Sequence, residues 1–249
     1  MRTICLGAHQ GAQNKAMFAS FESTRHDAPL PFTSGCITQI WKVDPQHPES
    51  QIVSLAGKVL SRGGVIIYPT ETLYGLGGNP KLPAVVERIF RIKGRELSKP
   101  LPLIASSLEA VYRAVAEWPI SAEKLSRAFW PGPLTLVLRA APHILPVIHG
   151  NTGRIAIRVS SHPVAQALAS KAGGLLIATS ANQANQRAYQ TPSEMPGEFL
   201  ALVDGLIDAG QCGGSAGSLP STIVDVSALG PRLIRAGCIP WEKLLGAVL

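Results

Sequence analysis

The densest cationic stretch of the chain spans residues 88–99, and within it Lys93 and Arg95 flank Gly94 where a helix is expected to end. A lysine point charge beside the fork of an arginine guanidinium suits a phosphate group, and a glycine lets the backbone approach that group closely. The same two charges would also complement the negative end of a helix dipole. The tripeptide by itself favours this second, purely structural interpretation.

Three small polar side chains, Thr179, Ser180 and Asn182, follow the apolar residues 175–178. Ligands bind beyond strand ends in open α/β sheets, and Ser180 and Asn182 point to the same side if the chain stays extended there. A helix cap or an Asx-turn explains the same residues equally well.

Two arginines, Arg154 and Arg158, lie four positions apart in a strand-like segment, so both side chains project from one face. Ile155 and Ile157 would then face the core. Arginines on an exposed face suit the binding of a carboxylate or a phosphate, and they suit surface ion pairs as well.

The glycine-rich segment at residues 75–78 fits neither the dinucleotide-binding fingerprint nor the Walker A pattern. Any use of ATP would therefore need another architecture, and a tight turn is the simpler interpretation of these glycines.

The four cysteines form no Cys-x-x-Cys pair, and the six histidines show no i, i+4 pairing. We therefore expect no zinc site, and dispersed cysteines are typical of reduced thiols in the cytosol.

The formal net charge of the chain is +7. Residues 1–49 contribute four cationic and four acidic side chains, so the whole excess lies in residues 50–249. This distribution indicates an anionic ligand, either a nucleotide or a nucleic acid, although a solubilising surface charge would look the same. The longest apolar runs are strand-sized, well short of the roughly 20 residues of a membrane helix.

Helical and strand-like patterns alternate after residue 50 and predict one α/β domain over residues 50–249, with a mixed, twisted open sheet flanked by helices. Residues 1–49 are predicted to be a flexible N-terminal extension, with a transit peptide and an over-extended start site as alternatives. Helices are predicted from Gln51 to the Gly63-Gly64 pair, over residues 83–92 and 164–172, and after a capping-box pattern at residues 106–109. Strands are predicted over residues 65–68, 101–104, 134–138, 155–159, 175–178, 202–207, 222–226 and 233–234, with a loop over residues 69–78.

The order and context of these segments closely resemble the YrdC-like threonylcarbamoyl-AMP synthases. The matching blocks are Tyr68-Pro-Thr-Glu-Thr-Leu-Tyr-Gly-Leu-Gly77, Ile92-Lys-Gly-Arg95 with Lys99-Pro-Leu, Trp130-Pro-Gly-Pro-Leu-Thr135, Ile155-Ala-Ile-Arg-Val159 with His162-Pro163, Ala178-Thr-Ser-Ala-Asn182, Pro220-Ser-Thr-Ile-Val-Asp225 and Leu233-Ile-Arg-Ala-Gly237. The resemblance covers about residues 50–240 and implies a YrdC-like fold.

The family signature, Lys-x-Arg followed far downstream by Ser-x-Asn, matches Lys93, Arg95, Ser180 and Asn182. The resemblance implies that Lys93 and Arg95 are catalytic and lie near the reacting carboxylate and phosphates. By position it implies ATP contacts from Arg95, Lys99, Ser180, Asn182 and Arg235, and threonine contacts from Thr72, Arg158 and Ser221. The assignment is loose by one or two residues around Thr72 and Ser221.

The resemblance implies a nucleotidyltransferase that makes threonylcarbamoyl-AMP and pyrophosphate from L-threonine, bicarbonate and ATP, with Mg²⁺ bridging phosphate oxygens. A downstream transferase would pass the product to tRNA, this chain could itself contact tRNA, and the expected compartment is the cytoplasm, away from any membrane. The chain departs from many relatives in having Glu96 after Lys-Gly-Arg, and it resembles the branch without an extra C-terminal domain.

Two other functions fit parts of the sequence. A basic cavity could bind RNA without catalysis, in which case affinity for RNA would fall steeply with salt. A carbamoyl-transfer domain of the hydrogenase-maturation kind has a similar fold, but it would be accompanied by zinc-finger and acylphosphatase segments, which this sequence does not contain.

Overall fold

The computed structural model describes residues 38–213, 219–228 and 230–248. Most of the predicted N-terminal extension, residues 1–37, lies outside the described residues and stays a prediction. The part of it that is described is not all irregular, because residues 39–42 form a strand. Regular structure therefore begins before Gln51, where the sequence pattern placed it.

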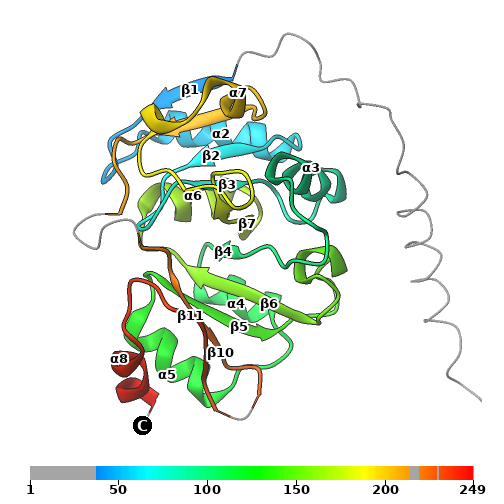
Figure 1. Cartoon of the computed structure of the whole chain (residues 1–249), viewed down its shortest axis with the longest axis vertical. Coiled ribbons are helices and arrows are strands. Elements are labelled where there is room, and N and C mark those ends of the chain that lie inside the picture. Colours follow the sequence, from blue (N-terminus) through cyan, green and yellow to red (C-terminus); the bar gives the residue numbers. More distant parts are fainter. Residues whose placement is uncertain (1–37, 214–218, 229, 249) are drawn as a thin grey trace, which may run out of the picture. The chain divides into compact units, whose positions relative to one another are not determined.

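One sheet has five strands, which run in the spatial order β1, β9, β2, β3, β8 (Figure 1). Strands β1, β9 and β2 are parallel to one another, whereas β3 pairs antiparallel with both β2 and β8. The bounds are β1 (Gln39–Lys42), β9 (Gly205–Asp208), β2 (Ile66–Tyr68), β3 (Gly75–Gly77) and β8 (Thr179–Ser180).

The second sheet has six strands, in the spatial order β11, β10, β5, β6, β4, β7. Parallel pairs join β10 to β5 and β4 to β6, and the other pairs are antiparallel. The bounds are β11 (Arg232–Arg235), β10 (Thr222–Asp225), β5 (Leu134–Arg139), β6 (Arg154–Val159), β4 (Leu103–Ala105) and β7 (Leu175–Ile177).

The predicted class, an α/β domain with mixed sheet, is confirmed, but the strands divide between two sheets instead of one. The division falls at Ala178, between β7 and β8, which are consecutive in sequence and belong to different sheets. There the Ala178 N–H donates to Pro102 O, and the Ile177 N–H donates to Gly78 O, so the two sheets are joined by backbone hydrogen bonds. Gly77 is required at this crossing, since a Cβ would lie 2.1 Å from Ile177 O.

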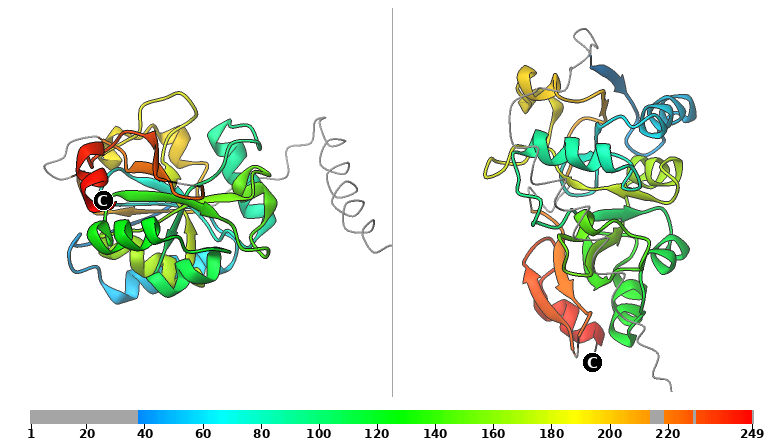
Figure 2. Two further views of the ribbon diagram at one scale, coloured as in Figure 1. Left: turned by 90° about the horizontal axis from the view of Figure 1, so that it is seen from below. Right: turned by 90° about the vertical axis from the view of Figure 1, so that its right-hand side faces the viewer.

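Helices cover the sheets, and α2 and α6 lie side by side, as Figure 1 and the right-hand view of Figure 2 show. Helices α5 and α8 pack against each other beside the six-stranded sheet. The bounds are α2 (Ser50–Ser61), α3 (Pro83–Lys93), α4 (Leu108–Ala114), α5 (Ile120–Phe129), α6 (Pro163–Lys171), α7 (Gly197–Leu200) and α8 (Trp241–Val248). Short 3-10 helices span Pro146–His149 and Pro192–Glu194.

The sequence placed α2, α3, α4 and α6 correctly, but the apolar spacing in α2 does not mark its buried face. The helix is predicted because Ile52, Leu55, Val59 and Leu60 recur at helical spacing, yet Leu60 is buried while Leu55 is 40% exposed. The buried face instead includes the small residues Ala56 and Gly57. The α4 helix begins with Ser107 as its N-cap, whose Oγ accepts from the Ala110 N–H.

Further elements were not predicted, among them the short strand β8 and the short helix α7. Residues 75–77 form β3 inside the segment predicted to be a loop, and α5 and α8 have no counterpart in the pattern of predicted helices. Within the described part of the chain, no helix has the length and apolar character needed to cross a membrane.

Candidate active site

A cavity of about 690 Å³ is lined by residues from both sheets and from the loop between β2 and β3. Of the nine site residues predicted from the sequence, seven line this cavity: Thr72, Arg95, Arg158, Ser180, Asn182, Ser221 and Arg235. Residues separated by up to 163 positions in the chain are thereby brought to one space. Lys93 and Lys99 are not part of the lining.

Lys93, at the C-terminal end of α3, lies directly behind the cavity wall. Its side chain is only 3% exposed, and its Nζ donates to Ser180 O at 2.6 Å and to Asn182 Oδ1 at 2.8 Å. The ammonium therefore reaches across to β8 instead of resting against the carbonyls of its own helix. Burial, together with the charge of Arg95, lowers the pKa of Lys93 to about 7. Protonated and neutral forms of Lys93 are thus both accessible near neutral pH.

Arg95 enters the cavity because α3 stops one residue earlier. Gly94 is the C-cap and has a left-handed backbone, with φ 57°, and the Arg95 N–H donates back to Phe90 O. One guanidinium nitrogen, Nη2, donates to Pro100 O at 3.2 Å. The buried Nε has no hydrogen-bond partner among the described residues, so part of this cation is left for a ligand.

Ser180 and Asn182 both line the cavity, although the chain does not stay extended between them: β8 ends at Ser180 and the Asn182 N–H donates back to Ser180 O. The Ser180 hydroxyl donates to Asn182 Oδ1 at 2.5 Å, the same oxygen that accepts from Lys93. The Asn182 side-chain amide also donates to Gln186 O, so it holds the following loop as well. The oxygen of Asn182 accepts from Lys93 and Ser180 and from no backbone N–H of the described residues, so neither the helix cap nor the Asx-turn is formed there, and the ligand-facing interpretation stays a prediction.

Arg158 is the centre of a second polar cluster. It is 6% exposed, and its Nε lies 3.1 Å from Glu71 Oε1, although neither atom completes a hydrogen bond of ordinary geometry. The other carboxylate oxygen of Glu71 accepts from the Ser160 hydroxyl. A nearly buried carboxylate therefore holds one side of the guanidinium and leaves the cavity side open.

Ser221 joins the second cluster to Arg235. Its Oγ lies 2.8 Å from Thr135 Oγ1 and accepts from Arg158 Nη1 at 3.4 Å and from Arg235 Nη2 at 3.1 Å. Arg235 also donates from Nε and Nη2 to Ser221 O. Burial lowers the pKa of Arg235, with Arg158 adding to the effect. Two guanidinium groups are thus gathered around one hydroxyl.

Thr72 is presented to the cavity by a turn that Thr70 organises. The Thr70 hydroxyl donates to Leu73 O at 2.6 Å and lies 3.0 Å from the Thr72 hydroxyl. Both threonine side chains are nearly buried and line the cavity. Their short side chains leave room for a small polar ligand next to Arg158.

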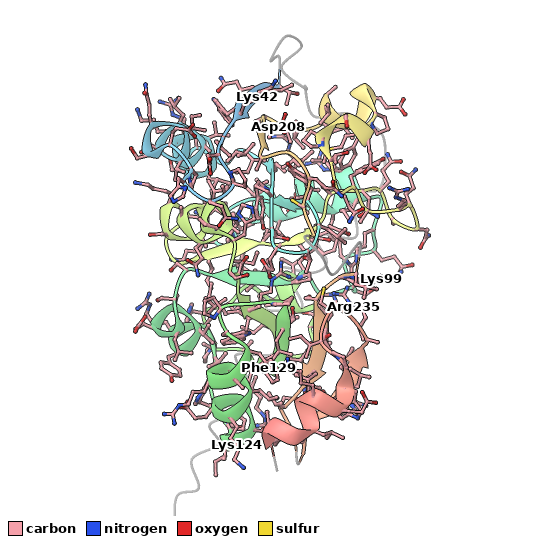
Figure 3. All side chains as sticks on the ribbon, turned by 90° about the vertical axis from the view of Figure 1, so that its left-hand side faces the viewer. Lys42, Lys99, Lys124, Phe129, Asp208 and Arg235 are labelled. Carbon is pink, nitrogen blue, oxygen red and sulfur yellow. The ribbon has the colours of Figure 1, made fainter. Side chains whose placement is uncertain are left out.

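Lys99 is exposed, and among the described residues its ammonium has no ion-pair or hydrogen-bond partner. Figure 3 labels it on the segment after α3, with Arg235 on β11. Glu96, the departure from the family pattern, is also exposed and lies outside the cavity lining, where it accepts from the Ser98 hydroxyl. The negative charge is therefore not inside the site that Arg95 serves.

The comparison with family models places this site in a known context. The model Sua5_yciO_yrdC, described as "Telomere recombination", matches residues 58–237, which include all nine predicted site residues. The chain belongs to this family.

Relatives of the Sua5/YciO/YrdC family support the match. A protein of Halorhodospira halophila named threonylcarbamoyl-AMP synthase is 38% identical over 159 residues, 64% of this chain and 83% of the relative. One of Pyrococcus abyssi with the same name is 32% identical over 192 residues, 77% of this chain. The match covers only 56% of the longer Pyrococcus protein. The crystal structure of P. abyssi Sua5 complexed with L-threonine is 31% identical and has a TM-score of 0.77, covering 84% of this chain and 61% of that one.

Several residues of the site were quoted within family blocks without being given a role. Glu71 and Thr70 stand in the first block, Thr135 in the third and Asp225 in the sixth, and all four are buried or nearly so. Thr135 could have been found from the strand period, because two-residue alternation puts it on the face opposite the buried Leu134 and Leu136. Nothing in the sequence indicates that Glu71 pairs with a residue 87 positions away.

The described residues contain no group of three His, Cys, Asp or Glu side chains placed to hold a metal ion. Of the acidic residues, Asp225 lines the cavity, and it is engaged with Ser227 and Arg232. The described side chains therefore do not fit a metal site built by the protein alone.

Proposed function

We propose that this chain is an L-threonylcarbamoyladenylate synthase, which makes threonylcarbamoyl-AMP and pyrophosphate from L-threonine, bicarbonate and ATP. The observation that carries the proposal is the single cavity that Arg95, Ser180 and Asn182 share with Arg158, Ser221 and Thr72. One set suits phosphates, the other suits the carboxylate and hydroxyl of a small amino acid, and the two reactants must meet for the reaction. The names of the curated relatives support the same activity.

The chemistry requires two bond-forming steps. The neutral amine of threonine attacks carbon dioxide derived from bicarbonate, forming a C–N bond and releasing a proton. An oxygen of the resulting carbamate then attacks the α-phosphorus of ATP, and the bond to pyrophosphate breaks. Neither step needs a covalent enzyme intermediate, so the protein must supply position and positive charge.

We assign ATP binding to Arg95, Lys99, Ser180, Asn182 and Arg235. Arg95 has a buried Nε without a partner, which a phosphate oxygen would satisfy. Ser180 and Asn182 add neutral groups that do not oppose the negative phosphates. The exposed Lys99 is free to turn toward the phosphates at the rim, where a flexible point charge suits a leaving pyrophosphate.

We assign the threonine subsite to Thr72, Arg158 and Ser221. Arg158 would bind the α-carboxylate, because Glu71 holds its far side and the near side faces the cavity. The hydroxyls of Thr72 and Ser221 would bond the hydroxyl of the substrate. The nearly closed setting of these residues would also protect the carbamate, which is labile in water.

Lys93 and Arg95 are proposed as the catalytic pair. Arg95 would contact the phosphates as negative charge develops on the leaving pyrophosphate. Lys93 would act from behind Asn182 and Ser180, and an arriving phosphate would favour its protonated form. Its positive charge would then be present when the phosphates are bound.

Mg²⁺ is expected to enter with ATP and to be held by phosphate oxygens, since the described side chains form no metal site of their own. A downstream transferase is the expected consumer of the product, and tRNA contact by this chain is part of the same proposal. The free thiols of Cys212 and Cys238 suit a reducing compartment, so we propose a cytoplasmic location.

The test is pyrophosphate release from ATP by the full chain, measured with and without L-threonine and bicarbonate. We expect release that needs both, with threonylcarbamoyl-AMP as the co-product in mass spectrometry. Release without threonine would indicate a different acceptor. No release, together with RNA binding that weakens steeply with salt, would favour the RNA-binding alternative.

A further inference from the structure

The six-stranded sheet contributes a carboxylate to the cavity that the proposed reaction does not use. Asp225, at the end of β10, is only 6% exposed, yet it lines the cavity together with Arg154. It belongs to the same strand face as Ser221 and Ile223, because these residues are spaced by two and all line the cavity. The alternation of side chains along the strand therefore places the carboxylate on the cavity face.

An apolar strip lies beside this carboxylate. The register pairs Val137 of β5 with Ala156 of β6 on one side and with Asp225 of β10 on the other. Ile223 and Ile234 also line the cavity, and Ile234 is 49% exposed although it is large and apolar. Aliphatic side chains on neighbouring strands form an apolar surface suited to a planar, weakly polar ring. A ring bound there would also cover the exposed side chain of Ile234.

Asp225 still has room for one more donor. Its Oδ1 accepts from the Ser227 N–H at 2.9 Å and from the Ser227 hydroxyl at 2.6 Å. Its Oδ2 accepts from Arg232 Nη2 at 3.3 Å and lies 4.0 Å from Arg154 Nη1. A carboxylate offers about four lone-pair sites, so one on Oδ2 remains.

Asp225 is held in its charged form. Burial by itself would raise the pKa of Asp225, but the hydrogen bonds from Ser227 and the nearby Arg232 and Arg154 outweigh burial and lower it. The group is therefore an acceptor only, and it cannot donate to a carbonyl oxygen of a ligand.

The spacing along β10 relates this carboxylate to the reacting end of the cavity. Ser221 and Asp225 are four residues apart, which is about 13 Å along an extended strand. We take the carbamate and the α-phosphate to meet near Ser221 and Arg158. The span to Asp225 is then longer than the distance in ATP from the α-phosphate to the ribose hydroxyls. It is close to the distance from the α-phosphate to the far edge of the base.

We propose that Asp225 accepts a hydrogen bond from the exocyclic amino group of adenine while the ring lies on Val137, Ala156 and Ile223, so that this residue selects ATP over 6-oxopurine nucleotides. The inference rests on the proposed use of ATP by this cavity. Hypoxanthine and guanine carry a carbonyl oxygen in place of the amino group. With the ring in the same position, that oxygen would face the carboxylate with no proton between them, and only a shift of the ring would bring the N1–H of a 6-oxopurine to Asp225.

The experiment measures binding of ATP, ITP and purine riboside triphosphate to the full chain by calorimetry, without threonine. Wild type should bind ATP roughly 10- to 100-fold more tightly than ITP, the range expected for reading one base edge. Purine riboside triphosphate lacks the amino group but adds no opposing oxygen, so it should fall between the two. Equal affinity of wild type for ATP and ITP would overturn the proposal, whether or not any variant folds.

The variant arm uses Asp225→Asn. In this variant the remaining carbonyl oxygen would keep the Ser227 donors in place of Oδ1, so the new amide N–H₂ would stand in place of Oδ2, where Arg232 loses its acceptor and a ligand meets a donor. The preference for ATP over ITP should then collapse or invert, with weaker ATP binding and tighter ITP binding. An unchanged preference in a folded variant would contradict the proposal.

The matched control is Asp208→Asn. Asp208 also ends a strand and accepts a backbone N–H, from Gly210, but it lies outside the cavity lining. It should keep the wild-type nucleotide preference. Because this experiment measures binding, it tests the adenine contact of Asp225 separately from the synthase activity. A wild type that prefers ATP over ITP but releases no pyrophosphate would support the adenine contact and contradict the proposed synthase activity.

Discussion

The ammonium of Lys93 donates to the side-chain oxygen of Asn182 across 2.8 Å, although the two residues are 89 positions apart. The contact joins the end of α3 to the segment after β8, and it fixes both halves of the family signature in one network. No carboxylate shares this network, because the other partners of Lys93 are Ser180 atoms. A phosphate in the cavity would therefore lie near a buried amine that no carboxylate pairs with.

Proton uptake on ATP binding follows from this arrangement. The pKa of free Lys93 is about 7, lowered from 10.5 by burial, so at pH 8.5 the amine is mostly neutral. Bound phosphates favour the charged form and raise the pKa again. Calorimetry at pH 8.5 in two buffers of different ionisation enthalpy should show proton uptake, and ATP affinity should fall as pH rises above about 7.

Lys93→Gln is the variant for this test, since its amide can still donate to Asn182 but cannot titrate. It should bind ATP without net proton uptake at pH 8.5 and with a flatter pH dependence. Identical uptake by wild type and Lys93→Gln would show that another group titrates.

Arg95→Lys tests the guanidinium itself. Lysine keeps the positive charge but has no fork to bridge phosphate oxygens, and it loses the Nε that is left without a partner. We expect a folded variant with a melting temperature close to wild type and a loss of adenylate synthesis of roughly a hundredfold or more, as when an oxyanion donor is removed. Asn182→Ala should lose less, because it removes a neutral contact.

The control is Arg91→Lys on the same last turn of α3, where the side chain is exposed and outside the cavity. It should synthesise the adenylate at the wild-type rate. Near-wild-type turnover of Arg95→Lys at saturating ATP, threonine and bicarbonate would remove the guanidinium fork from the reaction.

Local spacing predicted much of the site, because period-two alternation decides which strand residues share a face. Arg154 and Arg158 line the cavity while Ile155 and Ile157 are fully buried, as their alternation indicated. Local spacing could not predict long-range partners. Lys93 occupies a position that suits a helix dipole, and only the packing of α3 against β8 directs it elsewhere.

Packing also explains why the sequence pattern did not predict the buried face of α2, the division into two sheets or the strand β1. Apolar periodicity in α2 emphasised large side chains, whereas its close approach to α6 buries Ala56 and Gly57. The division into two sheets depends on Ala178, whose N–H bonds to Pro102 O, and no residue type there signals a change of sheet. In β1 the two apolar residues, Ile40 and Trp41, are adjacent between polar ones, and Trp41 alone is partly buried, so the strand lacks the apolar alternation that identifies one.

Substrate choice tests the threonine subsite. A pocket that bonds the substrate hydroxyl leaves polar groups unpaired when it binds valine, which has nearly the same shape. Thr72, Ser221 and Thr135 supply buried hydroxyls there. The kcat/KM for threonine should exceed that for valine by at least a hundredfold, in an assay of pyrophosphate release at saturating ATP and bicarbonate. Similar values for the two amino acids would remove the assignment of threonine as the substrate.

Two N-terminal truncations test the role of β1. Removing residues 1–37 leaves β1 and the family match at residues 58–237 untouched, so activity and melting temperature should stay at wild-type values. Removing residues 1–45 also deletes β1, which pairs with β9, and Trp41, whose ring covers Gly205. Loss of that partly buried aromatic should cost about 2 kcal/mol and lower the melting temperature by about 4–8 °C.

Below the lowered melting temperature both truncated chains should remain active, because β1 contributes nothing to the cavity. Equal melting temperatures for the two truncations would show that β1 adds no stability, and a large loss of activity in the shorter deletion would place residues 1–37 in the function.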